Sequence, residues 1–205
     1  MRTSSTSPEG ASHTAVWRVA RLLSDVFQPV LLGSCVLLVV AVTTSESFWH
    51  GLAWGIGTVL LTAGVPTLDI LRRMRRSTVD DFHIFAREQR LRPLLVALAS
   101  TVVAFSITVL FDASLSLQAC LLSALVTGVV LTVITGRWKI SFHAATAASS
   151  SVLLVWVLGP AALLLAPLAP AIAWSRVRLQ RHTPTQALAG LLVGLVLTLL
   201  VLSLY

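Results

Sequence analysis

Long stretches without a charged side chain constrain the fold of this sequence more than any other feature. Asp, Glu, Lys and Arg are absent from residues 26–45, 47–68, 93–111, 113–136, 140–175 and 182–205. A helix needs about 20 residues to cross the roughly 30 Å hydrocarbon core of a bilayer, and five of these stretches have the length of one span. Only 11% of the residues are charged and 56% are hydrophobic. Since about 25% of the residues in a soluble domain are charged, an ordinary soluble protein is excluded.

The stretch at 140–175 is too long for one span, and Gly159-Pro160 interrupts it near its middle. Because proline breaks a helix from its interior, we predict two short helices joined by a tight reversal. No strand pattern competes, since an open sheet edge in lipid would leave backbone groups unpaired. The predicted fold class is therefore all-α, a polytopic transmembrane helical bundle of about six to seven transmembrane helices. The expected helices lie near residues 26–44, 49–69, 93–111, 114–135, 143–158, 161–175 and 184–204.

The basic residues indicate how these helices are oriented. With seven spans, all 15 Lys and Arg residues fall on one side of the membrane, and the connections on the other side contain none. By the positive-inside rule, the basic side is the cytoplasm. We therefore expect a multi-pass protein of the cell membrane, with a disordered cytoplasmic tail over residues 1–25 and a single transmembrane domain over residues 26–205.

The net charge of +7 would in isolation suggest either nucleic acid or an anionic membrane surface as a partner. The basic residues gather beside the expected membrane helices, so the charge favours membrane lipids and not nucleic acid. The sequence does not predict an oligomeric state.

Ionisable residues close to the expected spans gather in three segments on one face, at residues 80–93, 137–143 and 175–186. Ionisable groups at membrane depth are costly, and by default they mark a functional site. A pair of expected helices separates each segment from the next, so the chain returns to the same face each time. We expect the three segments to converge on one site.

The third segment carries the most specific pattern. Ser175-Arg176 is followed after five residues by His182, and after three more by Gln186. This pattern resembles the last signature of the type 2 phosphatidic acid phosphatase superfamily, whose members are relatives of the vanadium haloperoxidases. That signature reads Ser-Arg, five residues, His, three residues, Asp, so Gln186 stands where the family has aspartate.

The other two segments resemble the same family's signatures in order and spacing. Residues 140–143, Ile-Ser-Phe-His, are similar to its Pro-Ser-Gly-His. Residues 87–93 end in Arg-Pro, as does its pattern of Lys, six residues, Arg-Pro. Phe85 occupies the lysine position, so Arg87 or Arg90 would have to supply the missing cation. The resemblance covers roughly residues 80–190, within a transmembrane domain that would then be phosphatase-like.

The resemblance implies an integral-membrane lipid phosphatase, which hydrolyses a phosphate or diphosphate monoester of a lipid of the prenyl diphosphate or phosphatidic acid type. It implies that His182 is the nucleophile and forms a phosphohistidine. His143 would protonate the departing oxygen, a role that needs an imidazole with a pKa near neutral. Such covalent catalysis uses no metal and no other cofactor. The implied partners are membrane lipids and a lipid phosphate substrate.

Anionic phosphate oxygens require cationic or polar donors, and arginine offers a rigid fork of donors suited to them. The candidate phosphate-binding residues are Arg87, Arg90, Arg92, Lys139, Ser141 and Arg176. Ser141 would stand just ahead of a helix and donate from its hydroxyl and its backbone, although it also fits a simple N-cap. The remaining arginines near these segments fit topology determinants that contact anionic head groups.

Gln186 is the third candidate for the catalytic machinery. In the family, an aspartate at this position holds the nucleophilic histidine in its productive tautomer and stabilises its cation, whereas glutamine accepts the hydrogen bond without contributing charge. In another catalytic triad, an amide in place of the carboxylate lowered turnover by about 10⁴. Residues 183–186, Thr-Pro-Thr-Gln, also fit a capping box with proline at the first helical position. Gln186 therefore has a structural explanation as well.

Two other functions stay open from the sequence. The first is a non-catalytic lipid-phosphate-binding membrane protein of the same fold, which the departures at Gln186, Phe142 and Phe85 favour. The second is a magnesium-dependent prenyl-transfer or cyclisation enzyme that uses Asp80 and Asp81. This pair lacks the further carboxylates expected of a magnesium-diphosphate motif. The lipid tail and the leaving group are not determined by the sequence.

Overall fold

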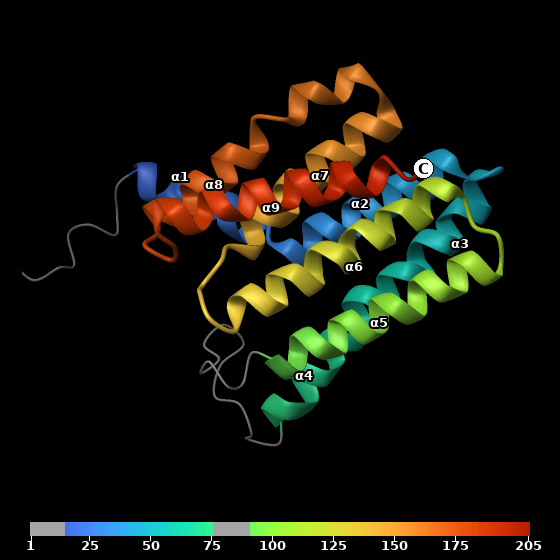
Figure 1. Cartoon of the computed structure of the whole chain (residues 1–205), viewed down its shortest axis with the longest axis horizontal. Coiled ribbons are helices and arrows are strands. Elements are labelled where there is room, and N and C mark those ends of the chain that lie inside the picture. Colours follow the sequence, from blue (N-terminus) through green and yellow to red (C-terminus); the bar gives the residue numbers. More distant parts are fainter. Residues whose placement is uncertain (1–14, 76–90) are drawn as a thin grey trace, which may run out of the picture.

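The computed structural model describes residues 15–75 and 91–205, and Figure 1 shows them as a bundle of helices. Within these two ranges all regular structure is helical, which confirms the predicted fold class. The α-helices are α1 (Ala15–Val26), α2 (Pro29–Thr44), α3 (Phe48–Val59), α4 (Val65–Arg75), α5 (Leu91–Leu110), α6 (Leu115–Thr135), α7 (Phe142–Leu158), α8 (Leu168–Arg178) and α9 (Pro184–Leu202). A π-helical segment, η2 (Leu60–Gly64), joins α3 to α4, and a 3-10 helix, η4 (Pro160–Leu165), precedes α8.

Five helical segments in the described ranges are long and apolar enough to cross a membrane. They are Phe48–Arg75, Leu91–Leu110, Leu115–Thr135, Pro160–Arg178 and Pro184–Leu202. Helices α1 and α2 are bent by 53° relative to each other and add a sixth span if they cross as one unit. Helix α7 is also apolar but has only 17 residues. This is a multi-pass membrane protein, as the charge-free stretches predict.

The expected helices appear in the expected order. The predicted reversal inside the longest apolar stretch is confirmed, since α7 ends at Leu158 and Gly159 takes a φ of +80°, which a residue without Cβ adopts at little cost. The helix expected near 49–69 continues to Arg75. Its last turn carries three arginines, and cations at the C-terminal end of a helix interact favourably with the helix dipole.

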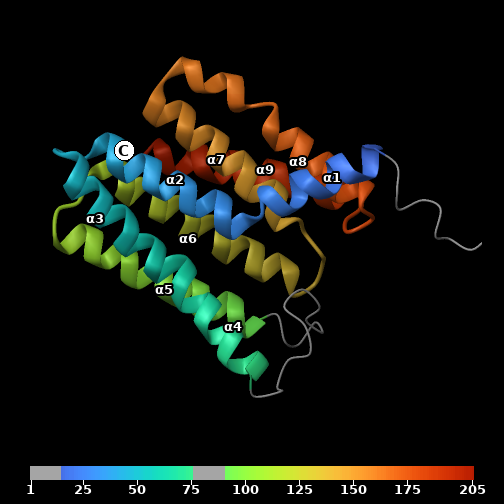
Figure 2. The ribbon, with the colours of Figure 1, turned by 180° about the vertical axis from the view of Figure 1, so that it is seen from behind.

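Composition predicts a solvated tail over residues 1–25, yet residues 15–26 form α1. The helix is amphipathic: Ala20 and Ser24 are buried, while Arg21 and Asp25 are exposed. It packs against α8, as Figure 2 shows. The buried face of α1 consists of two small residues, Ala20 and Ser24. Because the rest of the segment is largely polar, its composition does not predict a helix. Residues 1–14 lie outside the described residues.

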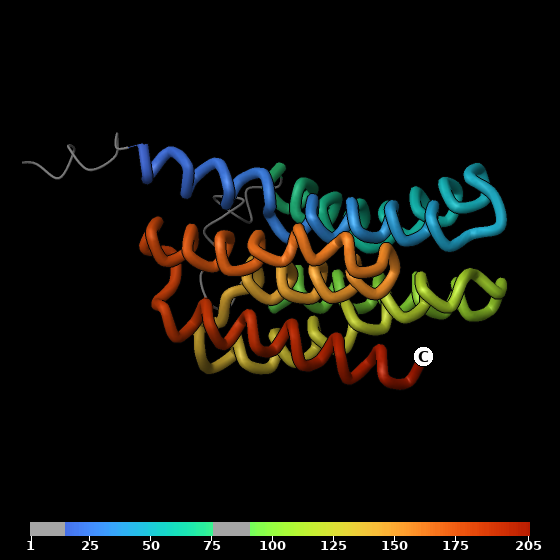
Figure 3. The backbone as a smooth tube through the Cα atoms, turned by 90° about the horizontal axis from the view of Figure 1, so that it is seen from above, coloured from blue at the N-terminus to red at the C-terminus, as the bar shows by residue number. Residues whose placement is uncertain are grey.

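Helix α7 is the central element and contacts α2, α6, α8 and α9. Figure 3 shows α9, drawn in red, running alongside α7, drawn in light orange. The buried side chains of α7 are almost all small: Ala144, Ala145, Ala147, Ala148, Ser150 and Leu153. In lipid, helices associate mainly through close packing, and small residues allow their backbones to approach.

Two glycines of α9 meet this small-residue surface. A Cβ at Gly190 would stand 2.5 Å from the carbonyl oxygen of Ser141, and one at Gly194 would meet the backbone of Ala145 even more closely. The hydroxyl of Ser149 donates to the carbonyl of Gly194 at 3.1 Å. The start of α9 is thereby fixed against the start of α7, which brings the second and third motif segments together.

We expect Gly194→Ala to lower the stability of the bundle by about 1–3 kcal/mol, because the added methyl group must push two helix backbones apart. Thermal unfolding of the purified protein in detergent measures the effect. Gly57→Ala on α3 is the matched control, since nothing lies within 4 Å of the Cβ position there. Equal melting temperatures for both variants would contradict the close α7–α9 packing.

Candidate functional site

Ser175 and Arg176 lie in the last turn of α8, and the chain reverses direction just after them. Ser175 is fully buried, and its hydroxyl donates to a carbonyl of its own helix at 2.7 Å. The backbone N–H groups of Arg181 and His182 both donate to the carbonyl of Arg176, at 3.0 and 3.2 Å. Gln180 provides the turn with a φ of +55°, a left-handed conformation common after helix ends. The five-residue spacing thus closes a loop that returns His182 to Arg176.

The guanidinium group of Arg176 lies between this loop and α1. Its Nη1 atom donates to the hydroxyl of Ser24, a side chain that is only 3% exposed. Its Nε atom is buried and has no hydrogen-bond partner among residues 15–75 and 91–205. An unpaired buried donor costs roughly 1–3 kcal/mol. The Nε–H group is therefore suited to an acceptor that a ligand brings.

The imidazole of His182 lies close enough to Arg176 and Lys139 for their charges to act on it. Burial has the largest effect, followed by the charges of Arg176 and Lys139, and together they lower the pKa of His182 to about 4. The side chain of Gln186 and the backbone of Lys139 act in the opposite direction. Even so, Nδ1 is buried with no hydrogen-bond partner in the described part of the chain. At neutral pH the ring is uncharged and one of its nitrogens carries a lone pair.

A backbone hydrogen bond joins the second motif segment, residues 137–143, to the third, residues 175–186. The N–H group of Ser141 donates to the carbonyl of Gln186 at 3.3 Å. Ser141 is fully buried, and its Oγ atom accepts a hydrogen bond from the N–H of Ala144 at 3.3 Å, which makes it the N-cap of α7. The N-cap role of Ser141, one of the two roles that the sequence allows, is therefore present in the structure.

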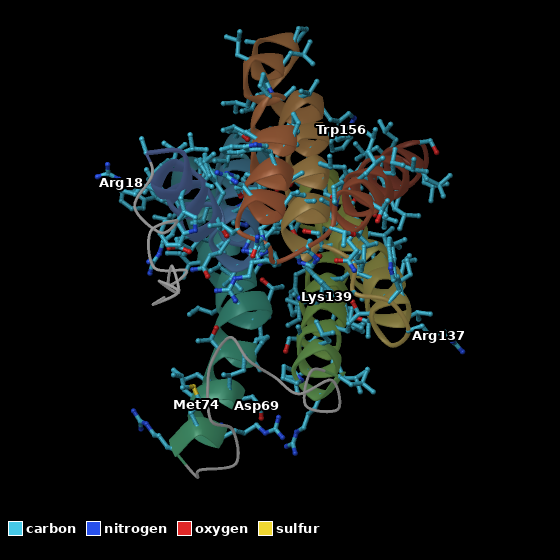
Figure 4. All side chains as sticks on the ribbon, turned by 90° about the vertical axis from the view of Figure 1, so that its left-hand side faces the viewer. Arg18, Asp69, Met74, Arg137, Lys139 and Trp156 are labelled. Atoms are coloured by element: carbon cyan, nitrogen blue, oxygen red, sulfur yellow. The ribbon has the colours of Figure 1, made fainter. Side chains whose placement is uncertain are left out.

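Lys139 and His143 stand on either side of this cap. Figure 4 looks at this end of the bundle and shows Lys139 near its middle, whereas Arg137 points outward. The effect of Lys139 on the pKa of His182 places its charge close to the imidazole. His143 is half-buried in the first turn of α7. The second motif segment thus provides Lys139 as a positive charge that acts on His182.

Gln186 occupies the third position of α9 and closes the predicted capping box. Its backbone N–H donates to the Oγ1 atom of Thr183 at 3.3 Å, and its side-chain Oε1 accepts from the N–H of Thr183 at 3.1 Å. The same side chain acts on His182. The capping box predicted for Gln186 is therefore confirmed, and the same side chain lies within hydrogen-bonding reach of His182.

The first motif is only partly described. Arg92 lies in the first turn of α5 and pairs with Asp69 of α4 at 4.0 Å, with its side chain 66% exposed. Among the interactions of the described residues, none joins Arg92 to Arg176 or His182. The other residues singled out in this segment lie outside the described residues: Asp80, Asp81, Phe85, Arg87 and Arg90.

The contact between Ser24 and Arg176 does not follow from the motif patterns of the sequence. The helical period of residues 15–26 could have revealed Ser24, since Ala20 and Ser24 are four residues apart and share a buried face. Its partner Arg176 lies 152 positions later in the chain. Sequence patterns within one helix do not reveal which distant helix packs against it.

A small apolar hollow of about 30 Å³ lies next to this site. It lies where the junction of α1 and α2 meets α7, η4 and α8. Its lining residues are Phe27, Leu32, Ala147, Ser150, Ser151, Leu154, Leu165, Leu168 and Ile172. Ile172 stands one helical turn before Arg176 on α8, so the apolar hollow and the polar site adjoin each other.

The sequence model of one protein family, the PAP2 superfamily, matches residues 70–205 of this chain. The match includes all three motif segments and α5 to α9, and it excludes α1 to α3. Comparisons with curated proteins and with solved structures gave no significant match.

We expect the imidazole of His182 to titrate at about pH 4, well below the ordinary histidine pKa. Arg176→Gln should raise this pKa, because it removes a nearby positive charge that disfavours the imidazolium. NMR titration of the histidine-labelled protein in detergent measures both values. Arg178→Gln, a change at an exposed arginine of the same helix turn, is the matched control and should leave the titration unchanged.

Proposed function

We propose that this chain, which belongs to the PAP2 superfamily, is an integral-membrane phosphatase that hydrolyses a phosphate or diphosphate monoester of a lipid. Membership of the family indicates a lipid phosphatase or a related activity. The loop from Arg176 to His182 is the main support for phosphate ester hydrolysis, because it places a buried cationic donor beside a neutral imidazole. Phosphoryl transfer to a side chain needs both a cation for the phosphate oxygens and an unprotonated nucleophile.

In the proposed reaction, a neutral imidazole nitrogen of His182 attacks the terminal phosphorus atom. The bond from that phosphorus to the leaving oxygen breaks, which is the lipid oxygen of a monophosphate or the bridging oxygen of a diphosphate. His143 donates a proton to that oxygen as the lipid alcohol, or the shorter phosphate ester, departs. Water then attacks the phosphohistidine and gives its proton to His143. Inorganic phosphate leaves and His182 is regenerated.

The cations act on the charge of the transferring group. Arg176 and Lys139 would stabilise the negative charge that spreads over the equatorial phosphate oxygens. Arg87 and Arg90 are proposed to join them from the first motif, and Ser141 to donate from the start of α7. Arg92, whose exposed side chain pairs with Asp69, would have to leave that ion pair to take part.

The apolar side chains that line the small hollow beside the site support a lipid as the substrate. The hollow begins one turn from Arg176 and is lined by hydrocarbon side chains and two serines. A head group at Arg176 would leave the first part of a prenyl or acyl chain beside this hollow. Burial of apolar chain surface contributes about 25 cal/mol per Å² to binding.

The positive-inside rule supports a cytoplasmic position for the site, so the proposed substrates are lipid phosphates of the inner leaflet. Trypsin digestion of sealed, right-side-out vesicles tests this orientation. Cleavage at the arginines in the last turn of α4, Arg72, Arg73 and Arg75, would contradict it.

We expect the purified protein to release phosphate from at least one lipid phosphate in excess chelator, and His182→Ala to lower the rate by about a thousandfold or more, because the nucleophile is lost. A panel of prenyl diphosphates and phosphatidic acid in mixed micelles provides the assay. His50→Ala on α3 is the control, since His50 is an exposed histidine that accepts a hydrogen bond from Trp54. Equal release from wild type and His182→Ala would reject the proposal.

We expect Gln186→Asp to increase turnover by at least about tenfold, because a carboxylate stabilises the imidazolium and its productive tautomer. Gln186→Asn is the matched control, since it has the size of aspartate without the charge. Steady-state kinetics with the best substrate of the panel gives the comparison. No hydrolysis by wild type together with hydrolysis by Gln186→Asp would instead favour a non-catalytic lipid-phosphate-binding protein.

A further inference from the structure

Helix α1 presents three different faces. Ala20 and Ser24 are buried against α8, while Val19 and Leu22 are exposed apolar side chains. On the charged face, Arg21 pairs with Asp25 at 3.5 Å and lies over the ring of Trp17 at 5.4 Å. The buried face therefore contributes one polar side chain to the contact with α8, and that side chain is Ser24.

The hydroxyl of Ser24 engages one particular edge of the Arg176 guanidinium. It accepts from Nη1, the nitrogen on the same side as the Cδ atom. The opposite edge consists of Nε and Nη2, whose N–H groups run side by side and match two oxygens of a phosphate. Nε on that edge is the buried donor without a partner among the described residues.

We propose that Ser24 is a positioning residue for the phosphate site: it binds Nη1 of Arg176 and thereby turns the Nε–Nη2 edge toward the ligand. The inference rests on the proposed function and names a residue outside the region matched to the family, which begins at residue 70. Ser24 contacts Arg176 and not the substrate. Helix α1 would therefore contribute to the phosphate site through Ser24, in addition to packing against α8.

A hydroxyl suits this position better than a carboxylate. A neutral acceptor orients the guanidinium and leaves its full positive charge for the phosphate, whereas a buried carboxylate would neutralise it. The carboxylate of Asp25, one residue later, acts on Arg176 electrostatically but points to the exposed face and pairs with Arg21. The register of α1 therefore places the neutral Ser24, and not the charged Asp25, against the guanidinium group of Arg176.

Phosphate affinity tests the positioning role. The full chain in lipid nanodiscs is titrated with inorganic phosphate by calorimetry or ³¹P NMR. We expect Ser24→Ala to weaken phosphate binding by about tenfold, the effect of losing one hydrogen bond to a charged group. Ser24→Asp should weaken it too, while Ser24→Thr, which retains the hydroxyl, should restore most of the affinity.

Two comparisons separate positioning from a general packing effect. Ser123→Ala removes another fully buried serine, on α6, and should leave phosphate binding unchanged. In an Arg176→Ala background, Ser24→Ala should have no further effect, because the two residues act as one unit. In turnover of a lipid phosphate, Ser24→Ala should raise KM more than it lowers kcat.

The outcomes distinguish this inference from the proposed function. Equal phosphate affinity of wild type and Ser24→Ala, no phosphate binding by wild type, or an equal loss in Ser123→Ala would overturn the positioning role. If Ser24→Ala weakens phosphate binding but no lipid phosphate is hydrolysed, the positioning role stands and the proposed enzymatic function fails.

Discussion

The close approach of the α7 and α9 backbones is the contact on which the rest of the structure depends. Helices in lipid gain no hydrophobic energy by associating, so their geometry is set by how closely their surfaces fit. Gly190 and Gly194 let α9 lie directly on the backbone of α7. This packing brings Ser141 to Gln186, so the segment before α7 and the loop before α9 share one end of the bundle.

A second constraint acts on the polar groups at that end. Each buried donor or acceptor must find a partner or carry the cost of lacking one. The carbonyl of Arg176 accepts two backbone N–H groups, Ser141 caps α7, and Gln186 caps α9. The remaining unpaired buried atoms near the loop are Nε of Arg176 and Nδ1 of His182, within the described ranges. Local capping thus satisfies the backbone, and these two side-chain nitrogens are left without a hydrogen-bond partner among the described residues.

Local signals predicted most of this arrangement. Charge-free stretches predicted the spans, Gly159-Pro160 the reversal, and Thr183 with Gln186 the capping box, because each depends on residues close together in the chain. The sequence did not predict α1, whose buried face is only Ala20 and Ser24. It did not predict the pairing of Arg92 with Asp69 either, since such contacts depend on which helices pack together. The roles assigned to His143, His182 and Gln186 stay predictions.

The neutral amide of Gln186 need not leave His182 without a counter-charge during the proposed reaction. Arg176 and Lys139 disfavour the imidazolium in the ligand-free site. In the proposed reaction, a bound phosphate would bring negative charge among those same cations and would offset their effect on the imidazole. An aspartate would supply that negative charge permanently, whereas here the substrate supplies it only while bound. The ring would then be neutral when it must attack and electrostatically supported once it carries the phosphoryl group.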